Sequence, residues 1–507
     1  MKQNMKKISA IFSSLLISIS TRTMSFGISS GLFTTAGITT LMAFNGLSFI
    51  VAEDEGYTCS CNTSEENFFS TKKYKKWFRQ NCNNELKNNR VIVIGAGLAG
   101  LTAAKKLKEQ GRKVVILEAR DRIGGRINTE QFGNDVVDMG ATLLQEFDGN
   151  PVTNVAETFG IEFSSLPDEI PKQVYDSITN TTFPGSNIYD TTNDFFQMLN
   201  KLKRMLGPNA SMKDAADKYI SLKNLVGEEA RRAKWVIEQY WVEAFYSGPA
   251  NETSLKSYYE DFGWDYGFPG GYGQITDAIA SGLNIRYNRE VVRIKYDTNG
   301  VRVKAGGRNY VGSHVIVTVP LGVLKDERIK FKPKLPFNKR NAIESLGMGS
   351  LEKVVLQFNE TFWPEGGLLY IDQPQGMLPM YIDTSPLQKK PTLVIYHGGN
   401  QAKATLGKND EEIKDLALER LSKALGINIP DPINYRVSRW SSDPFSLGSY
   451  SFIPVGSSAK DMLTLSEQTN CRVFYAGEAT TPDYYGSTHG AMITGTRVAD
   501  EVLEYLD

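Results

Sequence analysis

Three glycines and one glutamate are spaced as in a site that binds the phosphates and ribose of a dinucleotide. Gly95, Gly97 and Gly100 follow the pattern G-x-G-x-x-G, in which a tight turn brings the backbone close to a pyrophosphate at a helix N-terminus. Glu118 follows at roughly the 20-residue spacing expected for an acid that binds a ribose hydroxyl. An acid here favours an unphosphorylated ribose, as in FAD or NAD, over NADP. The alternative is an ordinary glycine turn that binds no cofactor.

The residues around these glycines predict the elements that position them. Val91–Ile94 are four β-branched residues in a row, a pattern typical of a strand buried on both faces of a parallel sheet. Leu101–Gln110 is rich in good helix formers, and Lys113–Leu117 reads as a second strand that ends at Glu118. The sequence therefore predicts a βαβ unit of a Rossmann-like α/β domain.

Composition limits the classes of function. The chain has 507 residues, enough for about two or three domains, and its 57 Lys and Arg balance 57 Asp and Glu. Because the chain carries no net basic charge, we expect no nucleic-acid partner. The histidines are only three, His314, His397 and His489, and no zinc-type cysteine pairs occur, so we expect no metal site.

Residues 1–52 resemble a targeting segment. Met1–Lys7 carries three lysines and Ile8–Ser20 is apolar, as in the n-region and h-region of a signal peptide. Met24–Ala52 contains no charged residue and is long enough to span a bilayer, and acidic residues follow it. We therefore expect an exported or membrane-anchored protein with the bulk of the chain outside the cytosol. A cleaved signal, an uncleaved single anchor and a disordered extension without a membrane role are the alternatives.

Residues 53–89 are polar and rich in Asn, Lys and Glu, which predicts a linker. They contain Cys59, Cys61 and Cys82, whereas Cys471 lies far downstream. Outside the cytosol we expect a local disulfide between Cys82 and one of the other two linker cysteines, and unpaired surface thiols are the alternative.

A basic, glycine-containing segment follows Glu118. Ala119–Thr129 reads ARDRIGGRINT. Its two adjacent glycines bring the backbone close to a ligand, and Arg120, Arg122 and Arg126 supply positive charge for phosphate. A basic solvated loop is the alternative. The pattern E-A-R-D-R-x-G-G-R resembles the flavin-containing amine oxidases, a family that includes monoamine oxidases, polyamine oxidases, L-amino-acid oxidases and histone lysine demethylases.

Later segments strengthen this resemblance, which extends from Arg90 to Asp507. They are DMGAT followed by GNP, FPGGYGQITDAIA, YNREVVRI, HVIVTVPLGVL, RWSSDPFSLGSYS and FYAGEATTPDYYGSTHGAMITG. The resemblance implies noncovalent FAD, with Val291 at the adenine, Glu478 at the ribityl or phosphate region and Thr488 at the flavin pyrimidine. Together the motifs predict cofactor contacts from Gly95, Gly97, Leu98, Ala99, Gly100, Glu118, Arg120, Gly125, Arg126, Ala141, Thr142, Val291, Trp440, Gly477, Glu478 and Thr488.

The resemblance also implies two interleaved domains. One is an FAD-binding Rossmann-like domain of the glutathione-reductase type, and the other is an α+β substrate domain, with the active site between them. In the first insertion, Asp214–Leu225 and Glu228–Tyr246 show helical spacing, and in the second, the strand patterns LEKVVLQF and PTLVIYH precede a helix at Asp410–Leu425. We expect residues 90–161, 267–330 and 435–507 in the FAD-binding domain, and residues 162–266 and 331–434 in the substrate domain.

One lysine is the candidate catalytic residue. In the family, a lysine on a strand shortly before an F-W pair holds a water against flavin N5, and Lys353 in GSLEKVVLQFNETFW matches it. Strand alternation places Lys353 opposite Val354, among apolar neighbours, where an unpaired lysine is costly or has a lowered pKa. A solvent-facing edge lysine is the alternative. The implied reaction moves a hydride from the carbon beside an amine nitrogen to flavin N5, and O2 then reoxidises the flavin to give H2O2.

We expect a small polyamine-like amine as the substrate. Ser487 stands where monoamine oxidases have a cage tyrosine, with Tyr485 nearby, a pattern closer to spermine oxidases and demethylases. Glu146 and Asp148 are candidates to pair with a second ammonium, and solvated loop charges are the alternative. An L-amino-acid or monoamine oxidase, a noncatalytic flavin-binding interaction module and an enzyme with a protein substrate are further alternatives, although an exported chain would not meet histones.

Overall fold

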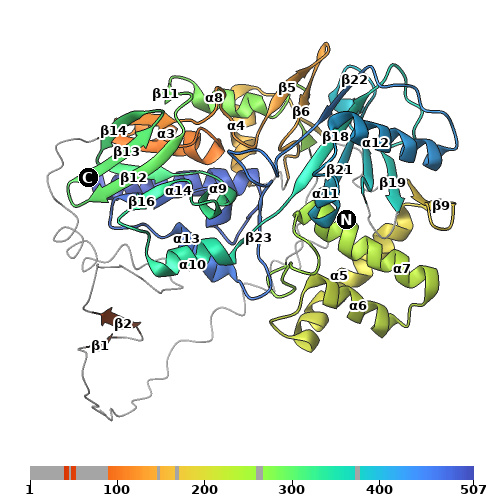
Figure 1. Cartoon of the computed structure of the whole chain (residues 1–507), viewed down its shortest axis with the longest axis horizontal. Helices are drawn as coiled ribbons and strands as arrows, with labels where there is room; N and C mark the ends of the chain where they lie inside the picture. The colour runs from red at the N-terminus through yellow and green to blue at the C-terminus, as the bar shows by residue number, and fades with distance from the viewer. Residues whose placement is uncertain are drawn as a thin grey trace, which may run out of the picture. The chain divides into compact units, whose positions relative to one another are not determined.

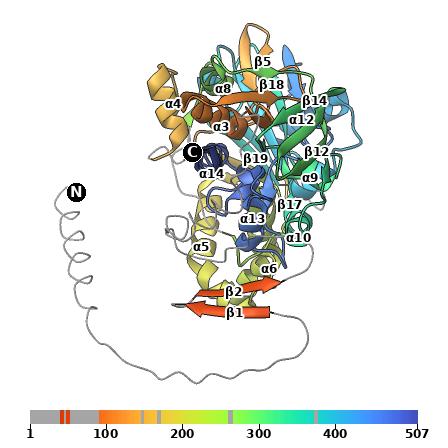
Figure 2. The same cartoon turned by 90° about the vertical axis from the view of Figure 1, so that its left-hand side faces the viewer.

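The computed structural model describes residues 39–44, 47–52, 90–145, 149–165, 171–258, 266–371 and 377–506. Met1–Tyr57 and Thr58–Asp507 are separate units. In the first unit, β1 (Thr39–Phe44) pairs with β2 (Leu47–Ala52) in an antiparallel hairpin (Figure 2). Within the described ranges, no helix has both the length and the apolar character needed to cross a membrane. Residues 1–38 of the predicted leader, and the linker with its three cysteines, lie outside the described residues.

A five-stranded parallel sheet is the central sheet of the second unit. Its middle strand is buried along Val91–Ile94, as the run of β-branched residues predicts. The strand predicted at Lys113–Leu117 is confirmed with the same bounds. The strand order is β11 (Ile285–Arg286), β4 (Lys113–Leu117), β3 (Arg90–Ile94), β15 (His314–Val317) and β24 (Val473–Tyr475).

The two faces of this sheet have different coverings, because alternate side chains of β3 point to opposite faces. Val91 and Val93 pack against four helices, which are α3 (Leu98–Glu109), α4 (Pro151–Phe159), α8 (Gly273–Ala280) and α14 (Thr488–Leu506). Ile92 and Ile94 pack towards a four-stranded sheet and three more helices. These are β14 (Arg308–Gly312), β13 (Gly300–Ala305), β12 (Val291–Asp297), β16 (Lys330–Lys332), α9 (Leu321–Lys325), α10 (Phe337–Ser345) and α13 (Ala459–Ser466). This layering is the predicted Rossmann-like α/β architecture.

Glycines allow α3 and α14 to pack closely on each other and on the sheet. A Cβ on Gly495 of α14 would lie 2.4 Å from the carbonyl oxygen of Ala99 in α3. A Cβ on Gly100 would lie 2.1 Å from the carbonyl oxygen of Gly95 at the end of β3. Both helices follow strands of the parallel sheet, so their N-termini lie at the carboxyl ends of those strands.

A seven-stranded mixed sheet forms a second part of the unit. Val354 and Leu356 on one face pack with α12 (Asp410–Leu425), whose bounds are those predicted, and Val174 and Leu369 on the other face pack with the π-helix η1 (Val236–Phe245). Figure 1 shows this sheet at the right and the four-stranded sheet at the left. The strand order is β22 (Asn434–Val437), β18 (Leu351–Gln357), β21 (Thr392–Gly398), β20 (Met380–Asp383), β19 (Gly367–Ile371), β8 (Gln173–Asp176) and β9 (Thr181–Pro184).

The first insertion is mostly helical, as predicted, but the predicted helix at Glu228–Tyr246 is not one α-helix. It divides into α7 (Gly227–Trp235) and the π-helix η1, because apolar spacing does not distinguish the two hydrogen-bond registers. Strands β8 and β9 also lie in this insertion, where the sequence analysis named helices but no strands. The other elements are α5 (Ser186–Leu206), α6 (Met212–Lys223), β7 (Ser164–Ser165), β10 (Tyr266–Gly267), β17 (Gly347–Met348), β23 (Ser451–Phe452), α11 (Gly399–Lys403), η2 (Ser385–Leu387) and η3 (Glu478–Thr480).

The hairpin of β5 (Thr129–Phe132) and β6 (Asp135–Asp138) joins the part built on the parallel sheet to the part built on the seven-stranded sheet. Its Phe132 and Val137 are buried in one cluster with Val355 of β18 and Val394 of β21. This apolar contact fixes the chain that follows β6 against β18. The contact therefore places residues 138–142 beside Lys353.

Candidate active site

A cavity of about 400 Å³ opens between the parallel sheet and the seven-stranded sheet. Its volume is within the range of about 300–1,000 Å³ usual for ligand pockets. Glu146 and Asp148 lie outside the described residues, and Gly100 does not line the cavity. Of the sequence-predicted site residues, the lining contains Gly95, Gly97, Leu98, Ala99, Glu118, Arg120, Gly125, Arg126, Ala141, Thr142, Val291, Lys353, Trp440, Gly477, Glu478, Tyr485, Ser487 and Thr488.

The turn between β3 and α3 has the backbone that its glycines predict. Gly95 has φ +103°, a conformation that favours glycine, and a Cβ there would lie 2.7 Å from the Thr318 hydroxyl oxygen. Gly97 lines the cavity and forms a parallel bridge with Gly124 of the following glycine pair. Gly100 lies behind the turn, so its contribution is the close packing of helix on strand.

Glu118 is buried at the end of β4 and lines the cavity. One carboxylate oxygen accepts a hydrogen bond from the backbone N–H of Ala96 at 2.6 Å, and the other accepts from the backbone N–H of Arg120 at 2.9 Å. The glycine turn therefore fixes the carboxylate in place. It stays available to a ribose hydroxyl through its remaining lone pairs.

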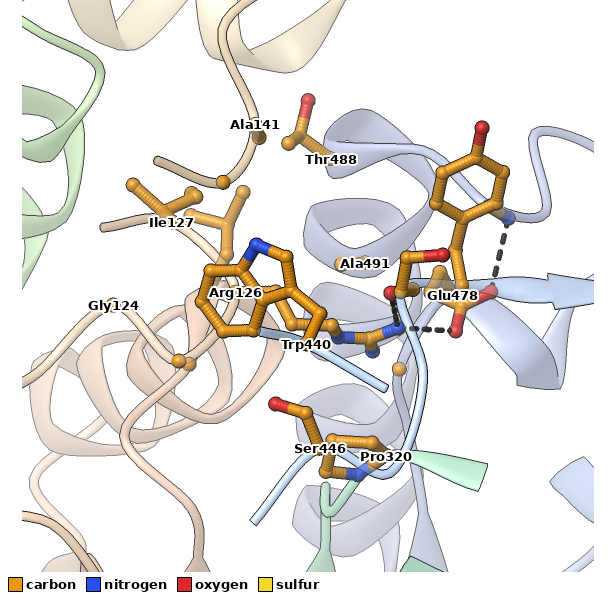
Figure 3. Close-up of a pocket in the computed structure, with 18 of the residues that line it drawn as sticks. Gly124, Arg126, Ile127, Ala141, Pro320, Trp440, Ser446, Glu478, Thr488 and Ala491 are labelled. Carbon is orange, nitrogen blue, oxygen red and sulfur yellow. Dashed lines mark hydrogen bonds and ion pairs between the residues drawn. The ribbon is translucent and has the colours of Figure 1, made fainter. Parts of the chain in front are cut away.

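The arginines after Glu118 are paired with carboxylates. Arg120 donates two hydrogen bonds to Asp443, at 2.8 and 2.7 Å, and Arg126 donates to Glu478 at 2.8 Å (Figure 3). Arg122 donates to backbone carbonyls and does not line the cavity, unlike the phosphate-facing group that the sequence predicted. Because Arg120 and Arg126 are each already paired with an acid, their binding of phosphate stays a prediction. The pairs tie this segment to the C-terminal part of the chain.

The C-terminal motif forms the wall around the start of α14. Gly477 has φ +129°, and no atom lies within 4 Å of where its Cβ would stand, so its backbone is open to a ligand. The other carboxylate oxygen of Glu478 accepts from Ser451 at 2.6 Å and from the N–H of Gly486 at 3.0 Å. Thr488 begins α14 and lines the cavity. The acid is thus fully bound by the chain that surrounds it.

Lys353 is buried, with 4% of its surface exposed, and is one of the residues that line the cavity. The Nζ atom donates to the carbonyl oxygen of Asp138 at 3.1 Å, to the carbonyl oxygen of Gly140 and to the hydroxyl of Thr142. It also lies 5.1 Å from the ring centre of Tyr396. We call the oxygens of Asp138, Gly140 and Thr142 the oxygen cage.

The oxygen cage corrects the expectation of an unpaired lysine. An ammonium group has three N–H donors, and the cage supplies three acceptors. A water held by Lys353 must therefore displace one of them. Burial lowers the pKa of Lys353 to about 8, an effect that the Asp138 carboxylate partly opposes. Burial also raises the pKa of Asp138 to about 6, so both groups are charged between about pH 6 and about pH 8.

An aromatic wall outside the set of predicted site residues completes the cavity. Trp241 and Phe245 of η1 stack with ring centres 5.0 Å apart, and Tyr450 donates from its hydroxyl to the carbonyl oxygen of Phe245. Helical spacing does not separate Trp241 from the buried core residue Trp235 beside it. Tyr450 lies within the RWSSDPFSLGSYS motif, so the family resemblance could have identified it as a site residue.

The described residues fit a flavin dinucleotide. The N-termini of α3 and α14 both open into the cavity, through Leu98, Ala99 and Thr488. Free N–H groups at a helix N-terminus favour negatively charged groups such as phosphate. Gly97 follows the central strand β3 and Gly477 follows the edge strand β24, and both line the cavity. A thiol for covalent attachment is absent from the described lining.

Comparisons with known proteins give the same family. Residues 98–503 match the family of flavin containing amine oxidoreductases. The chain is 34% identical over 432 residues to Protein FLOWERING LOCUS D of Arabidopsis thaliana, covering 81% of this chain and 54% of that protein. It is 31% identical over 448 residues to Probable polyamine oxidase 4 of the same plant, covering 82% and 87%. The chain spans about half the length of FLOWERING LOCUS D and of the plant lysine-specific histone demethylase homologs.

Solved structures share the fold. A putrescine oxidase bound to putrescine matches with a TM-score of 0.69 and 22% identity, covering 82% of this chain and 99% of that one. A cyclohexylamine oxidase from Brevibacterium oxydans IH-35A matches with a TM-score of 0.70 and 24% identity, covering 83% and 99%. The extent of the family match and the geometry of the cavity agree. The chain belongs to the family of flavin-containing amine oxidoreductases, and FAD is its cofactor.

Proposed function

We propose that this chain oxidises an amine to an imine with FAD as the oxidant. The observation that carries the proposal is that one cavity contains the buried ammonium of Lys353, the N-terminus of α14 and the glycine turn after β3. When bound, FAD supplies a hydride acceptor at N5 and a route for the electrons to O2, which gives H2O2. The residues that would hold it are those of the glycine turn, Glu118, Gly477 and Thr488.

The chain's own contribution is to bind the substrate amine in its neutral form. A protonated amine does not readily release hydride, so the amine must lose its proton in the cavity. Burial lowers the pKa of an ammonium group, and a nearby positive charge lowers it further. The aromatic wall of Trp241, Phe245, Tyr396 and Tyr450 excludes water, and cationic Lys353 supplies the nearby charge. Both effects favour the neutral, reactive amine.

Within this class we favour a polyamine-like substrate. Glu146 directly follows Gln145, which lines the cavity, and Asp148 lies two residues further along the chain. A carboxylate there would pair with a second ammonium. The relative named Probable polyamine oxidase 4 is matched over 87% of its length. We expect spermine, spermidine or their N-acetylated forms to produce peroxide with purified, FAD-loaded protein. If amino acids were oxidised and no polyamine were, the proposed polyamine substrate class would be wrong.

An L-amino-acid oxidase is the second candidate, and the described arginines do not favour it. Such an enzyme needs a cation for the substrate carboxylate. The arginines of the described lining are Arg120, Arg126, Arg289 and Arg328. Each of the four already donates to a carboxylate, hydroxyl or carbonyl oxygen of the chain. A noncatalytic flavin-binding module is the third candidate, and an anaerobic flavin spectrum that no amine bleaches would favour it.

We also propose that the chain is exported or anchored, with its catalytic part outside the cytosol. Residues 1–52 supply the targeting pattern. Cys471 is disulfide-bonded, and disulfides persist in oxidising compartments. We expect the full-length protein in the exported or membrane fraction after cell fractionation, with Cys471 protected from alkylation until a reductant is added. Recovery in the cytosolic fraction with a free Cys471 thiol would contradict this.

A further inference from the structure

Asp138 is a buried acid behind the oxygen cage. It ends β6 and does not line the large cavity, and 7% of its surface is exposed. Its backbone oxygen belongs to the cage and accepts from Lys353 Nζ at 3.1 Å. Asp138 therefore contacts Lys353 through its backbone oxygen, whereas its carboxylate faces the protein interior.

The carboxylate of Asp138 is held at the N-terminus of α8. The backbone N–H of Tyr272 donates to its two oxygens at 3.1 and 3.0 Å, and the Thr129 hydroxyl donates to one of them. The N–H of Gly273 in turn donates to Thr129 at 2.8 Å. These bonds fix the start of residues 138–142, which supply every oxygen of the cage.

Tyr272 extends the same contact to the N-terminus of α14. Its hydroxyl lies 2.7 Å from the hydroxyl oxygen of Thr488, the first residue of α14. Ala141 and Thr488 lie at the same end of the cavity (Figure 3). Asp138 thus contacts the residue that joins the cage segment to the helix N-terminus predicted to face the flavin.

Among the described residues, the charges of Asp138 and Lys353 act mainly on each other. The Lys353 ammonium is the one charge that lowers the pKa of Asp138, and the Asp138 carboxylate is the one charge that raises the pKa of Lys353. A small cavity of about 10 Å³ beside Asp138 is lined otherwise by neutral residues, among them Thr142, Thr384 and Gln388. Burial raises the pKa of the Tyr272 phenol, which therefore stays neutral through the physiological range.

We propose that Asp138 is a positioning residue whose negative charge keeps Lys353 cationic and its oxygen cage intact. The inference rests on the proposed amine oxidation, in which Lys353 acts. Three cage oxygens match the three donors of an ammonium, whereas a neutral amine has two donors and turns a lone pair towards one of these oxygens. The cage is therefore complete while the lysine is charged, and the nearby carboxylate favours that state.

The variant Asp138→Asn separates charge from hydrogen bonding. An asparagine oxygen still accepts from Tyr272 and Thr129, so the position of residues 138–142 is retained, but the negative charge is lost. A purely structural role predicts a small change in stability alone. A role through charge predicts that Lys353 loses its proton at a lower pH, because an opposite charge nearby raises the pKa of a lysine.

The test uses two pH titrations of the FAD-loaded full chain. The first measures kcat/KM with a turned-over amine, whose alkaline limb in the wild type we expect near pH 8, where Lys353 deprotonates. The second follows the absorbance spectrum of the resting flavin without substrate. In Asp138→Asn we expect both alkaline midpoints to move to lower pH by about one unit. Midpoints equal to those of the wild type would overturn the proposal.

Asp135→Asn is the matched control. Asp135 lies on the same strand with the same 7% exposure, and its carboxylate accepts from the backbone N–H groups of Val136 and Lys389. We expect this variant to leave both alkaline midpoints unchanged. An equal shift in Asp135→Asn would show a general effect of β6 and would also overturn the proposal.

Thr129→Val provides the test if Asp138→Asn does not fold. The variant removes one hydrogen bond to the carboxylate, a bond that lowers the pKa of Asp138, and keeps its charge. In the spectral titration we expect the midpoint at acid pH, where Asp138 takes up a proton, to rise and the midpoint at alkaline pH to stay unchanged. An unmoved acid midpoint would contradict the proposal. If the wild type oxidises no amine, the proposed function fails, whereas the spectral titration still decides the role of Asp138.

Discussion

Gly100→Ala is expected to abolish the yellow colour of the purified protein. The added Cβ would lie 2.1 Å from the carbonyl oxygen of Gly95 and 2.9 Å from the Thr318 hydroxyl oxygen. A backbone oxygen cannot rotate away, so α3 must move from β3 and open the turn that receives the pyrophosphate. We expect the free energy of unfolding to fall by about 3 kcal/mol. Urea unfolding and the flavin absorbance of the reconstituted protein measure the two effects.

Gly407→Ala is the control for this change. Gly407 is exposed, and no heavy atom lies within 4 Å of where its Cβ would stand. The same substitution there should change the free energy of unfolding by no more than about 0.5 kcal/mol and leave the flavin bound. If Gly100→Ala retained both wild-type stability and FAD, the packing of α3 on β3 would not be what forms the cofactor site.

The second large effect is expected for Lys353→Met. Methionine fills a similar volume but leaves the carbonyl oxygens of Asp138 and Gly140 without their donor and removes the charge beside the substrate amine. Loss of one preorganised donor at an active site typically lowers the rate by about 100-fold or more. We expect that loss in the rate of anaerobic flavin reduction by amine, with FAD still bound, because Lys353 is predicted to act in the reaction and not to hold the cofactor.

Lys339→Met is the matched control for Lys353→Met. Lys339 is also buried, and its ammonium donates to the carbonyl oxygens of Thr464, Leu465 and Glu467. It does not line the cavity. We expect this variant to lose stability while the flavin reduction rate per bound FAD stays near that of the wild type. Equal rate losses in both variants would indicate that general destabilisation explains the effect of Lys353→Met.

The local parts of the fold could be predicted from the sequence. The βαβ unit, the strand of Lys353 and the helix at Asp410–Leu425 have the predicted type. The second strand of the βαβ unit and the helix at Asp410–Leu425 also have the predicted bounds. Helix propensity and the alternation of buried and exposed positions repeat over a few residues of the chain, so the periodicity of the sequence reports them directly. The π-helix η1 was not predicted, because apolar spacing over ten residues does not separate i→i+5 from i→i+4 hydrogen bonding.

The candidate site was also predicted only in part from the sequence. By itself the sequence determined which residues could bind a dinucleotide. The glycine spacing allows the backbone to approach the phosphates, and the acid after the second strand can bind the ribose. Tertiary structure alone decided the partners: the oxygen cage brings residues 138–142 to Lys353, and Asp443 and Glu478 come to Arg120 and Arg126. These partners lie more than two hundred residues apart in the chain, and no local pattern encodes which distant polar groups meet. The packing of the β5–β6 hairpin on β18 brings residues 138–142 to Lys353.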